Sequence, residues 1–410
     1  MRVAARTSSF QFKGREIDVA DVGRRLHVDA ILEGSVRRSG NRLRITAQLV
    51  STRDGYQLWS EAYDREVKDV FAVQEDIARA IISALQVKLG ARRSAALRSR
   101  PTNDLAAYDV YLKGRFAWNQ RTSTGMQEAV RHLEQAVARD SGFALAWAAL
   151  ADAYVLAIPY AGAPREVDWP KARAAAAKAL ALDSTVGEAH TALAYGTMIY
   201  DWNWVAAESS FRRAIRVDPA YPTGHQWYAD FLWSQGRLDE ALEQMQQAQR
   251  LDPLSLVIAT ELGQTYYLMH RFDKAEEQLR GTVLVYAQQH RYRQAIDVMR
   301  RSLDLGGFLE DLAGGLAYTY AASGDRASAT RYTAELTRRL ASGRVGPFAL
   351  ALAYTGQGNL TRGFAYLDSA IAVRDIFLPE DFFDPQLDAL RADPRFDAIE
   401  EKMHVGRKRK

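Results

Sequence analysis

The sequence predicts an α+β protein that is mostly helical, with a small α/β domain followed by a longer all-α solenoid of helical hairpins. Two patterns indicate this fold. Small residues recur every 34 positions at Ala207, Ala241 and Ala275, and apolar residues alternate with polar ones between Leu43 and Leu49. A 34-residue period is typical of stacked helix pairs, and a period of two is typical of a half-buried strand. The 410 residues, 48% of them apolar, are enough to bury a core in each part.

Composition excludes several classes of site. The chain has no cysteine, which excludes disulfides and thiolate metal sites. It has no run of about 20 apolar residues and no apolar signal segment at its start, so we expect no membrane span. The sequence leaves the compartment open between the cytoplasm and, if a membrane helix lies upstream, the periplasm. The first hundred residues carry 19 basic against 12 acidic side chains, a weak indication of nucleic-acid binding.

Changes in pattern along the chain predict four segments. They are an α/β domain at 1–90, a linker at 91–104, helical repeats at 105–375, and a C-terminal cap with a basic tail at 376–410. Pro101 marks the linker because proline disfavours helix in the residue before it. In the cap, we expect three side chains to cover the last apolar face: Phe396, Ile399 and Met403.

The α/β domain is predicted element by element. Alternating or apolar runs indicate strands at 1–5, 30–36, 43–50 and 57–63, and amphipathic spacing indicates helices at 18–27 and 69–89. Gly40 and Asn41 favour a hairpin turn because both residues tolerate positive φ. Four arginines cluster at this hairpin and are expected on a solvated face, with an anion-contacting patch as the alternative: Arg37, Arg38, Arg42 and Arg44.

The N-terminal segment resembles the TolB N-terminal-like (FlgO-like) domain over about residues 1–90. The resemblance lies in residues 2–8 (RVAARTS), 32–36 (LEGSV), 43–50 (LRITAQLV) and 57–61 (QLWSE). It implies a domain that begins upstream of Met1, and hence an incomplete domain with an open sheet edge. It also implies a place downstream of a serine/threonine kinase, a nucleotide cyclase or a winged-helix regulator.

The helical part resembles a tetratricopeptide-repeat array. We predict helix pairs at 105–120 with 124–139, at 144–157 with a second helix marked by Ala172 and Ala179, at 186–200 with 204–217, and at 222–235 with 238–251. Pro219 and Pro253 close two of the repeats because proline cannot continue a helix. The proline- and glycine-containing stretch 158–170 is expected to be a long inserted loop.

The repeat phase breaks near residues 276–295. Ala275 is followed by its counterpart Ala295 after only 20 residues, 14 short of a full unit. We expect a single long helix from Phe272 to Gln289, with Gly281 costing about 1 kcal/mol relative to alanine. The 34-residue rhythm then resumes with Ala329 and Gly363.

A tetratricopeptide-like array would line its concave surface with first-helix residues. The polar and aromatic composition of these positions fits a peptide-binding groove, and a merely solvent-facing surface is the equal alternative. The predicted groove residues are Asp152, Tyr195, Gln226, Asp230, Trp233, Gln264, Tyr267 and Tyr318.

The sequence contains no motif for phosphate, dinucleotide or zinc-protease chemistry. We therefore predict no catalytic residue, no metal site and no cofactor, with any catalytic domain lying outside this chain. Glu380, Asp381 and Asp384 could suggest a cation site, but their order lacks a calcium-loop pattern, so a solvated loop is preferred. The aromatic turn at 200–204 is expected to pack between repeats.

These features favour a non-catalytic protein- or peptide-binding scaffold, acting as the sensory or partner-docking part of a bacterial signalling protein. One alternative is the C-terminal fragment of a kinase or cyclase. Another is a nucleic-acid-associated regulator, whose DNA retention would fall steeply with salt.

Overall fold

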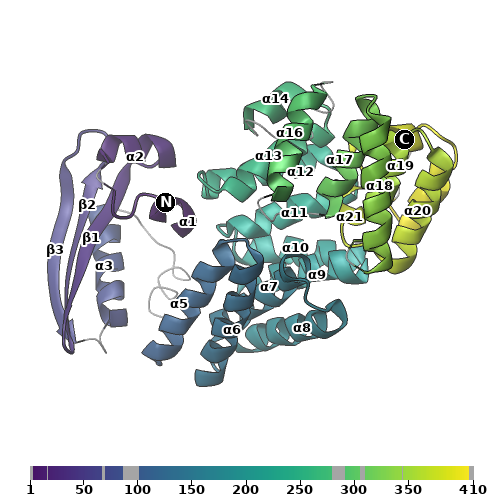
Figure 1. The fold of residues 1–410 in the computed structure, drawn as a ribbon. Helices are drawn as coiled ribbons and strands as arrows, with labels where there is room; N and C mark the ends of the chain where they lie inside the picture. Colours follow the sequence, from purple (N-terminus) through teal and green to yellow (C-terminus); the bar gives the residue numbers. More distant parts are fainter. Residues whose placement is uncertain are drawn as a thin grey trace. The chain divides into compact units, whose positions relative to one another are not determined.

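The computed structural model describes residues 3–15, 17–66, 70–85, 101–278, 291–304, 310–343 and 345–405. The chain divides into two compact units, each described by itself below. The first unit comprises Met1–Ala163, Lys171–Ala189 and Gln249–Ser255. The second comprises Pro164–Pro170, His190–Ala248 and Leu256–Lys410. Figure 1 shows a small sheet near the N-terminus and helical hairpins through the rest of the described chain, which confirms the predicted fold class.

A three-stranded antiparallel sheet forms the N-terminal part of the first unit. Its strands β1 (Ala30–Ser39), β2 (Arg42–Ser51) and β3 (Gln57–Glu66) lie in the order β1-β2-β3. The alternating side chains of β2 are buried at Leu43, Ile45, Ala47 and Leu49, as the period of two predicts. Leu43, Ile45 and Tyr63 pack with Val73 of α3 (Val70–Ala84), so this helix covers the apolar face.

The predicted strand at residues 1–5 is wrong. Residues 3–5 form no strand, and α1 (Arg6–Phe10) follows directly. The Ala5 amide donates to the Leu251 carbonyl at 2.9 Å, and the Thr7 and Ser8 hydroxyls both donate to the Asp252 carboxylate. These contacts reach more than 240 residues along the chain, and no local pattern can reveal them. By contrast, α2 (Val19–Leu26) begins after Asp18 as expected, because the Asp18 carboxylate accepts the Ala20 amide.

Two helix pairs complete the first part of the array: α5 (Leu105–Asn119) with α6 (Ser123–Arg139), and α7 (Ala144–Ala161) with α8 (Arg165–Leu182). The predicted long loop at 158–170 is wrong, because α7 continues through Pro159 and α8 already contains Pro170. The Pro164 carbonyl accepts the amides of Val167 and Asp168 at 3.0 and 2.9 Å, which starts α8 early. Only residues 162–164 remain as the connection.

Among the described residues, α7 alone is long and apolar enough to cross a membrane by composition. Two-thirds of its apolar window (67%) is buried within the protein. A mostly buried helix of this kind is also what the core of a water-soluble fold contains, so the indication of a membrane span is weak.

The array continues through α9 (Gly187–Gly196), a π-helical turn (Thr197–Asp201), α10 (Trp204–Val217), α11 (Pro222–Ser234) and α12 (Leu238–Leu251). The next elements are α13 (Leu256–Leu268), α14 (Phe272–Gln278) and α16 (Tyr292–Asp304). They are followed by α17 (Glu310–Ala322), α18 (Arg326–Ala341), α19 (Pro347–Gly356) and α20 (Leu360–Val373). The long helix expected through Gly281 falls largely on residues 279–290, outside the described part of the chain.

The small residues of the 34-residue period lie where helices pass closest. Ala207, Ala241, Ala275 and Ala295 are fully buried, and Ala329 is 1% exposed. A larger side chain at these positions would hold the paired helices apart. This explains why alanine and glycine occupy the repeating positions.

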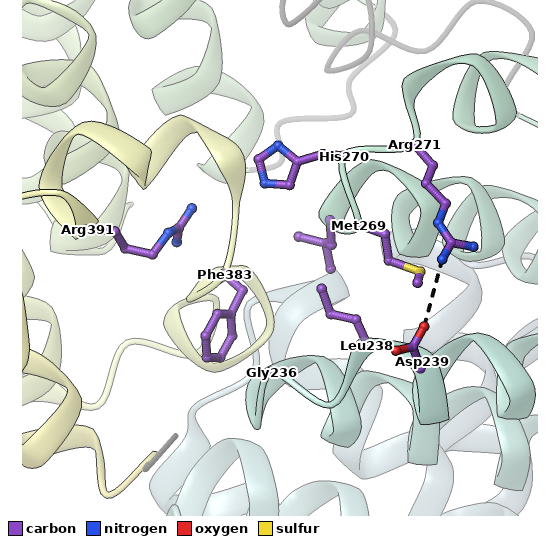
Figure 2. A pocket seen from close by; sticks show the side chains of 9 residues that line it. Gly236, Leu238, Asp239, Met269, His270, Arg271, Phe383 and Arg391 are labelled. Atoms are coloured by element: carbon purple, nitrogen blue, oxygen red, sulfur yellow. Dashed lines mark ion pairs between the residues drawn. The ribbon is translucent and has the colours of Figure 1, made fainter. Parts of the chain in front are cut away.

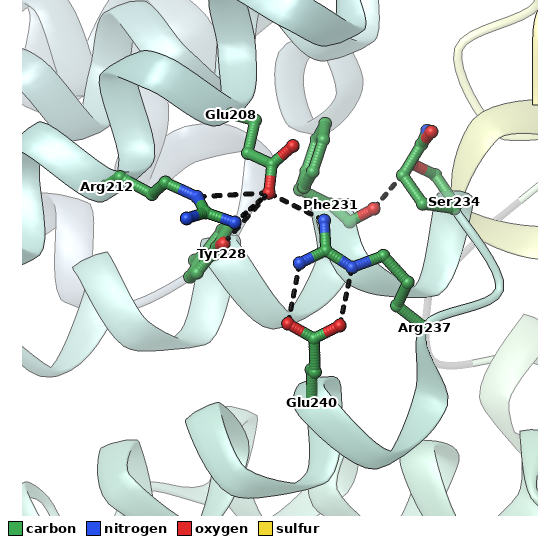
Figure 3. A network of polar contacts seen from close by, with 8 residues as sticks. Glu208, Arg212, Tyr228, Phe231, Ser234, Arg237 and Glu240 are labelled. Carbon is green, nitrogen blue, oxygen red and sulfur yellow. Dashed lines mark hydrogen bonds and ion pairs between the residues drawn. The ribbon is translucent and has the colours of Figure 1, made fainter.

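A polar network ties α10, α11 and α12 together (Figure 3). One Glu208 oxygen accepts from Arg212 at 2.8 Å and from Arg237 at 2.6 Å. Arg237 also donates twice to Glu240, at 2.7 and 2.6 Å, and so lowers the pKa of that carboxyl. The Tyr228 hydroxyl donates to the same Glu208 oxygen at 3.3 Å. A bidentate arginine shared between two helices fixes their relative rotation as well as their spacing.

The chain ends in a run of short elements: α21 (Leu378–Asp381), a 3₁₀ turn (Pro385–Leu387), α22 (Asp388–Arg391) and α23 (Phe396–Met403). Phe396, Ile399 and Met403 are buried. The Met403 carbonyl accepts the Trp204 indole N–H at 2.9 Å, which ties α23 to α10 as well as to α20. The aromatic turn that contains Trp204 therefore has a structural role, because Trp204 contacts α23.

Gly196 is a sensitive point of the second unit, because a Cβ atom placed there would lie 2.2 Å from the Trp169 ring. The ring is held in place by its indole hydrogen bond to Asp201 at 2.9 Å. We expect Gly196→Ala to lower the free energy of unfolding by about 1–3 kcal/mol through overpacking, measured by urea unfolding followed by circular dichroism.

Gly315→Ala is the matched control for that change. Gly315 also lies inside a helix, but its nearest neighbour, Gln386, is at an ordinary 3.6 Å. The alanine there should be neutral or stabilising by up to about 1 kcal/mol. Equal stability of Gly196→Ala and the unchanged protein would contradict the tight packing around Trp169.

Candidate functional site

The predicted groove residues are divided between the two units. Asp152 lies in α7 of the first unit, is fully buried, and pairs with Arg115 at 3.3 Å. The Arg115 guanidinium in turn stacks over Trp118, 4.7 Å from the ring centre. Asp152 is therefore part of the packing between α5 and α7. The other seven predicted residues lie in the second unit.

Helix α11 carries three of these seven residues and is buried along its whole length from Thr223 to Ser234. Gln226, Asp230 and Trp233 are each at most 3% exposed. The Gln226 amide donates to Glu261 of α13 at 3.0 Å, so it links two neighbouring first helices. The alternative of a merely solvent-facing surface is wrong for these positions.

The C-terminal segment, which we define as residues 378–391, covers this surface. The Tyr195 hydroxyl of α9 donates to Glu380 at 2.7 Å. From α13, the Gln264 amide donates to Asp381 at 3.3 Å and the Tyr267 hydroxyl donates to Asp384 at 2.9 Å. Tyr195 is further oriented by stacking on Trp227, with ring centres 4.4 Å apart. Tyr318, in α17, is half-buried and packs against Gly356.

The expectation of a solvated acidic loop is therefore wrong. Asp381 is 9% exposed and Asp384 is 4% exposed. Among the described residues, no three acidic or histidine side chains converge as a metal site would require. The acidic side chains of the C-terminal segment instead accept hydrogen bonds from the predicted groove residues.

Apolar side chains anchor the C-terminal segment. Four of them are fully buried: Leu378, Phe382, Leu387 and Leu390. Phe382 stacks on Phe396 with ring centres 5.3 Å apart. Phe383 lies against the turn after α11, where Gly236 has a φ of +67° and a Cβ atom would lie 2.9 Å from the ring.

Arg391 holds the C-terminal segment in its bent shape. Its guanidinium donates to the Phe382 carbonyl at 3.0 Å, to the Asp384 carbonyl, and to the Asp388 carboxylate at 2.5 Å. These bonds satisfy backbone carbonyls that a short, irregular segment would otherwise leave without helical partners.

Burial raises the pKa of the Asp384 carboxyl in the C-terminal segment. Burial raises its pKa to about 6, against the opposing effects of hydrogen bonds from the Gln386 amide and the Tyr267 hydroxyl and of the Arg391 charge. The nearby Asp388 adds slightly to the rise. Burial likewise raises the pKa of Tyr195 well above its usual value, with Glu380 adding to the effect, so this hydroxyl remains a donor.

A cavity of about 410 Å³ adjoins the C-terminal segment (Figure 2). Its walls are the turn after α11, with Gly236, Leu238 and Asp239, and the turn after α13, with Leu268, Met269, His270 and Arg271. Phe383 and Arg391 close it from the C-terminal segment. The Asp239 and Arg271 side chains pair across its edge at 3.9 Å.

The arginine cluster of the first unit lies on the exposed β1–β2 hairpin. Arg37 stands opposite Arg44 in the strand register, and β3 places Asp64 opposite Arg44 and Glu66 opposite Arg42. Acidic cross-strand neighbours reduce the positive potential of this face, which favours the solvated reading over an anion-binding patch.

Comparison with known proteins supports the repeat assignment. Residues 232–297 match the family model described as a tetratricopeptide repeat. Over this segment the chain is similar to tetratricopeptide repeats. The match includes the end of α11, α12 to α14 and the start of α16. It therefore includes three of the predicted groove residues, Trp233, Gln264 and Tyr267.

Two curated relatives are signalling or regulatory proteins by name. Putative adenylate cyclase 3 of Rhizobium meliloti is 44% identical over 148 residues, which is 36% of this chain and 25% of that protein. Transcriptional regulator HilA of Salmonella typhimurium is 24% identical over 252 residues, which is 61% of this chain and 45% of that protein. The chain thus spans less than half the length of each of these relatives.

Solved structures with similar folds include a thermophilic tetratricopeptide-repeat protein of Thermus thermophilus. It is 19% identical, with 49% of this chain and 95% of that one covered and a TM-score of 0.36. Yeast Tom70 is 13% identical, with 75% and 71% of the two chains covered and a TM-score of 0.40.

Asp384 should make the free energy of unfolding depend on pH. Because its pKa is about 6 when folded and 3.8 for the ordinary carboxyl, the folded protein binds a proton more tightly than the unfolded chain. The contribution of Asp384 to the free energy of unfolding is fully present below about pH 4 and is lost as the pH rises through 6. The total loss is about 3 kcal/mol. Asp384→Asn keeps the Oδ1 acceptor for Tyr267 and Gln386 without the charge. We therefore expect it to be more stable than the unchanged protein by about 1–3 kcal/mol at pH 7.5, and by much less at pH 4.5.

Urea unfolding at the two pH values measures this difference. Asp393→Asn is the matched control, because Asp393 has a pKa lowered to about 2 by its exposed pairing with Arg395 and has already ionised across this range. A variant at Asp384 whose gain in stability is the same at both pH values would contradict the assignment.

Proposed function

We propose that this chain is a non-catalytic protein-docking module, the partner-binding part of a bacterial signalling protein. The observation that supports it most directly is the seating of the C-terminal segment. Three groove side chains, Tyr195, Gln264 and Tyr267, hydrogen-bond to carboxylates of a short, largely non-repetitive stretch of polypeptide. A surface that holds one such stretch has the donors and apolar sockets required to hold a partner's.

The repeat architecture supports the same role. Each helix pair buries its apolar stripe only against its neighbours, so the array consists of stacked surfaces with the first helices side by side. Such surfaces present side chains from several helices to one extended ligand. Among the described residues, no three His, Asp or Glu side chains are grouped so that they could hold a metal ion.

The signalling context rests on the relatives and on the N-terminal resemblance. A protein named as a putative adenylate cyclase shares 44% identity over 148 residues, and the TolB-like resemblance of residues 1–90 implies the same setting. A second candidate function follows from this observation: the chain is the region downstream of a cyclase or kinase catalytic domain.

The docking function is tested by site-directed photo-cross-linking in cells of the source organism. A photo-reactive phenylalanine analogue replaces Tyr318, which is half-buried on a first helix, or Val205, which is 84% exposed on a second helix. We expect a discrete cross-linked partner from position 318 and none from position 205. The same products from both positions, or no products from either, would count against a first-helix docking surface.

The second candidate is tested by reading the DNA upstream of the Met1 codon. An open frame that continues into a cyclase, kinase or winged-helix domain is the expected result. A stop codon in frame immediately upstream would remove this candidate and leave the docking module as a protein in its own right.

A further inference from the structure

On the basis of that docking function, we propose that the groove formed by α9, α11 and α13 recognises a protein segment in which an aromatic pair is flanked by carboxylates. We propose further that residues 378–391 of this chain are its tethered competitor. The partner is thus a protein strand with the chemistry of Glu-Asp-Phe-Phe-Asp, and docking requires the C-terminal segment to leave.

The groove side chains indicate which chemical groups the partner segment must present. The three donors are two hydroxyls and one amide, on Tyr195, Tyr267 and Gln264, and they come from two different helices. All three point to carboxylates at positions spaced as Glu380, Asp381 and Asp384. Neutral donors bind carboxylates by geometry and provide little long-range attraction, so the order of acidic residues around the aromatic pair determines the fit.

The aromatic pair supplies the apolar part of recognition. Phe382 is fully buried, whereas Phe383 is half-buried and lies edge-on to Phe382 with ring centres 5.3 Å apart. Phe383 forms one wall of the 410 Å³ cavity with Met269 and His270. A partner with a larger side chain at the position of Phe383 would fill space that the C-terminal segment leaves open, and so would gain contacts that the tethered competitor lacks.

The tether explains why the groove is closed in the isolated chain. Only residues 374–377 separate α20 from α21, and a short linker gives a tethered ligand an effective concentration on the order of millimolar. Against this advantage stands Asp384, whose carboxylate is buried with neutral donors around it. The tethered state is thus held by proximity and by its buried apolar side chains, and it is weakened by one unfavourable burial.

The proposal is tested with the full-length chain and a fluorescein-labelled synthetic peptide of residues 378–391. Binding is measured by fluorescence anisotropy at pH 7.5, with a scrambled peptide of the same composition as the control. Phe382→Ala removes the buried anchor of the tethered segment, so this variant should bind the peptide at least tenfold more tightly than the unchanged chain. Asp384→Asn in the chain should bind it no more tightly than the unchanged chain, because the tethered segment is then better held.

Two further results decide the outcome. If Phe382→Ala loses its helical circular dichroism signal, Phe383→Ala replaces it, because Phe383 is only half-buried. A threefold gain in peptide affinity or more is then expected. Peptide affinity unchanged in a folded variant, or equal binding of the scrambled peptide, would overturn the proposal.

The peptide assay contains no cellular partner, so its result is independent of the result of the cross-linking experiment. Peptide binding without a cross-linked partner would refute the docking function and leave the groove chemistry intact. A cross-linked partner without peptide binding would keep the docking function and refute the competitor.

Discussion

The second unit depends on the complete burial of α11. A helix in a two-layer stack ordinarily keeps a polar stripe toward water, but every residue from Thr223 to Ser234 is buried. The neighbouring α10 and α13 cover part of its circumference, and α21 of the C-terminal segment packs on it as well. The polar residues of α11 and its neighbours must then find their hydrogen-bond partners within the protein, because water no longer reaches them.

The identity of those partners follows from what the groove offers. Tyr195, Gln264 and Tyr267 present hydroxyl and amide donors, and a covering segment must therefore supply acceptors. Carboxylates are strong acceptors, but burying their charge is costly. Asp384 shows the cost in its pKa of about 6, since burial outweighs two hydrogen bonds and the Arg391 charge. Good hydrogen-bond matching and unfavourable charge burial thus act in opposite directions at the same residue.

The balance between hydrogen bonding and charge burial at Asp384 depends on a rigid helical scaffold around it. The Arg237 guanidinium joins Glu208 of α10 to Glu240 of α12, and these two helices flank α11 in the chain. The alanines of the 34-residue period let the helices approach closely. Because the scaffold is fixed by close packing and by a bidentate arginine, the groove donors keep their spacing whichever segment covers them.

The sequence predicts those parts of the molecule that local periodicity determines. The strand alternation from Leu43 to Leu49 and the helix near residues 18–27 depend on residues within a few positions, and the buried alanines follow the 34-residue period, so all three could be predicted. The α7–α8 connection was predicted too long, since prolines within helices were read as loop formers. The acidic segment was misjudged for a different reason. Its carboxylates look solvated in sequence, and only Phe382, fully buried between them, signals a packed segment.

The repeat pattern indicates which side chains point to the first-helix side, but it contains no information on what lies opposite. Trp233 illustrates the consequence. Its indole nitrogen is buried with no hydrogen-bond acceptor among the described residues, and a buried donor left unpaired costs about 1–3 kcal/mol. The C-terminal segment packs on α11, the helix that carries Trp233, and the indole N–H stays without an acceptor among the described residues. A covering segment with an acceptor at that point would make a hydrogen bond that the chain's own C-terminal segment does not make, although four fully buried apolar side chains anchor that segment.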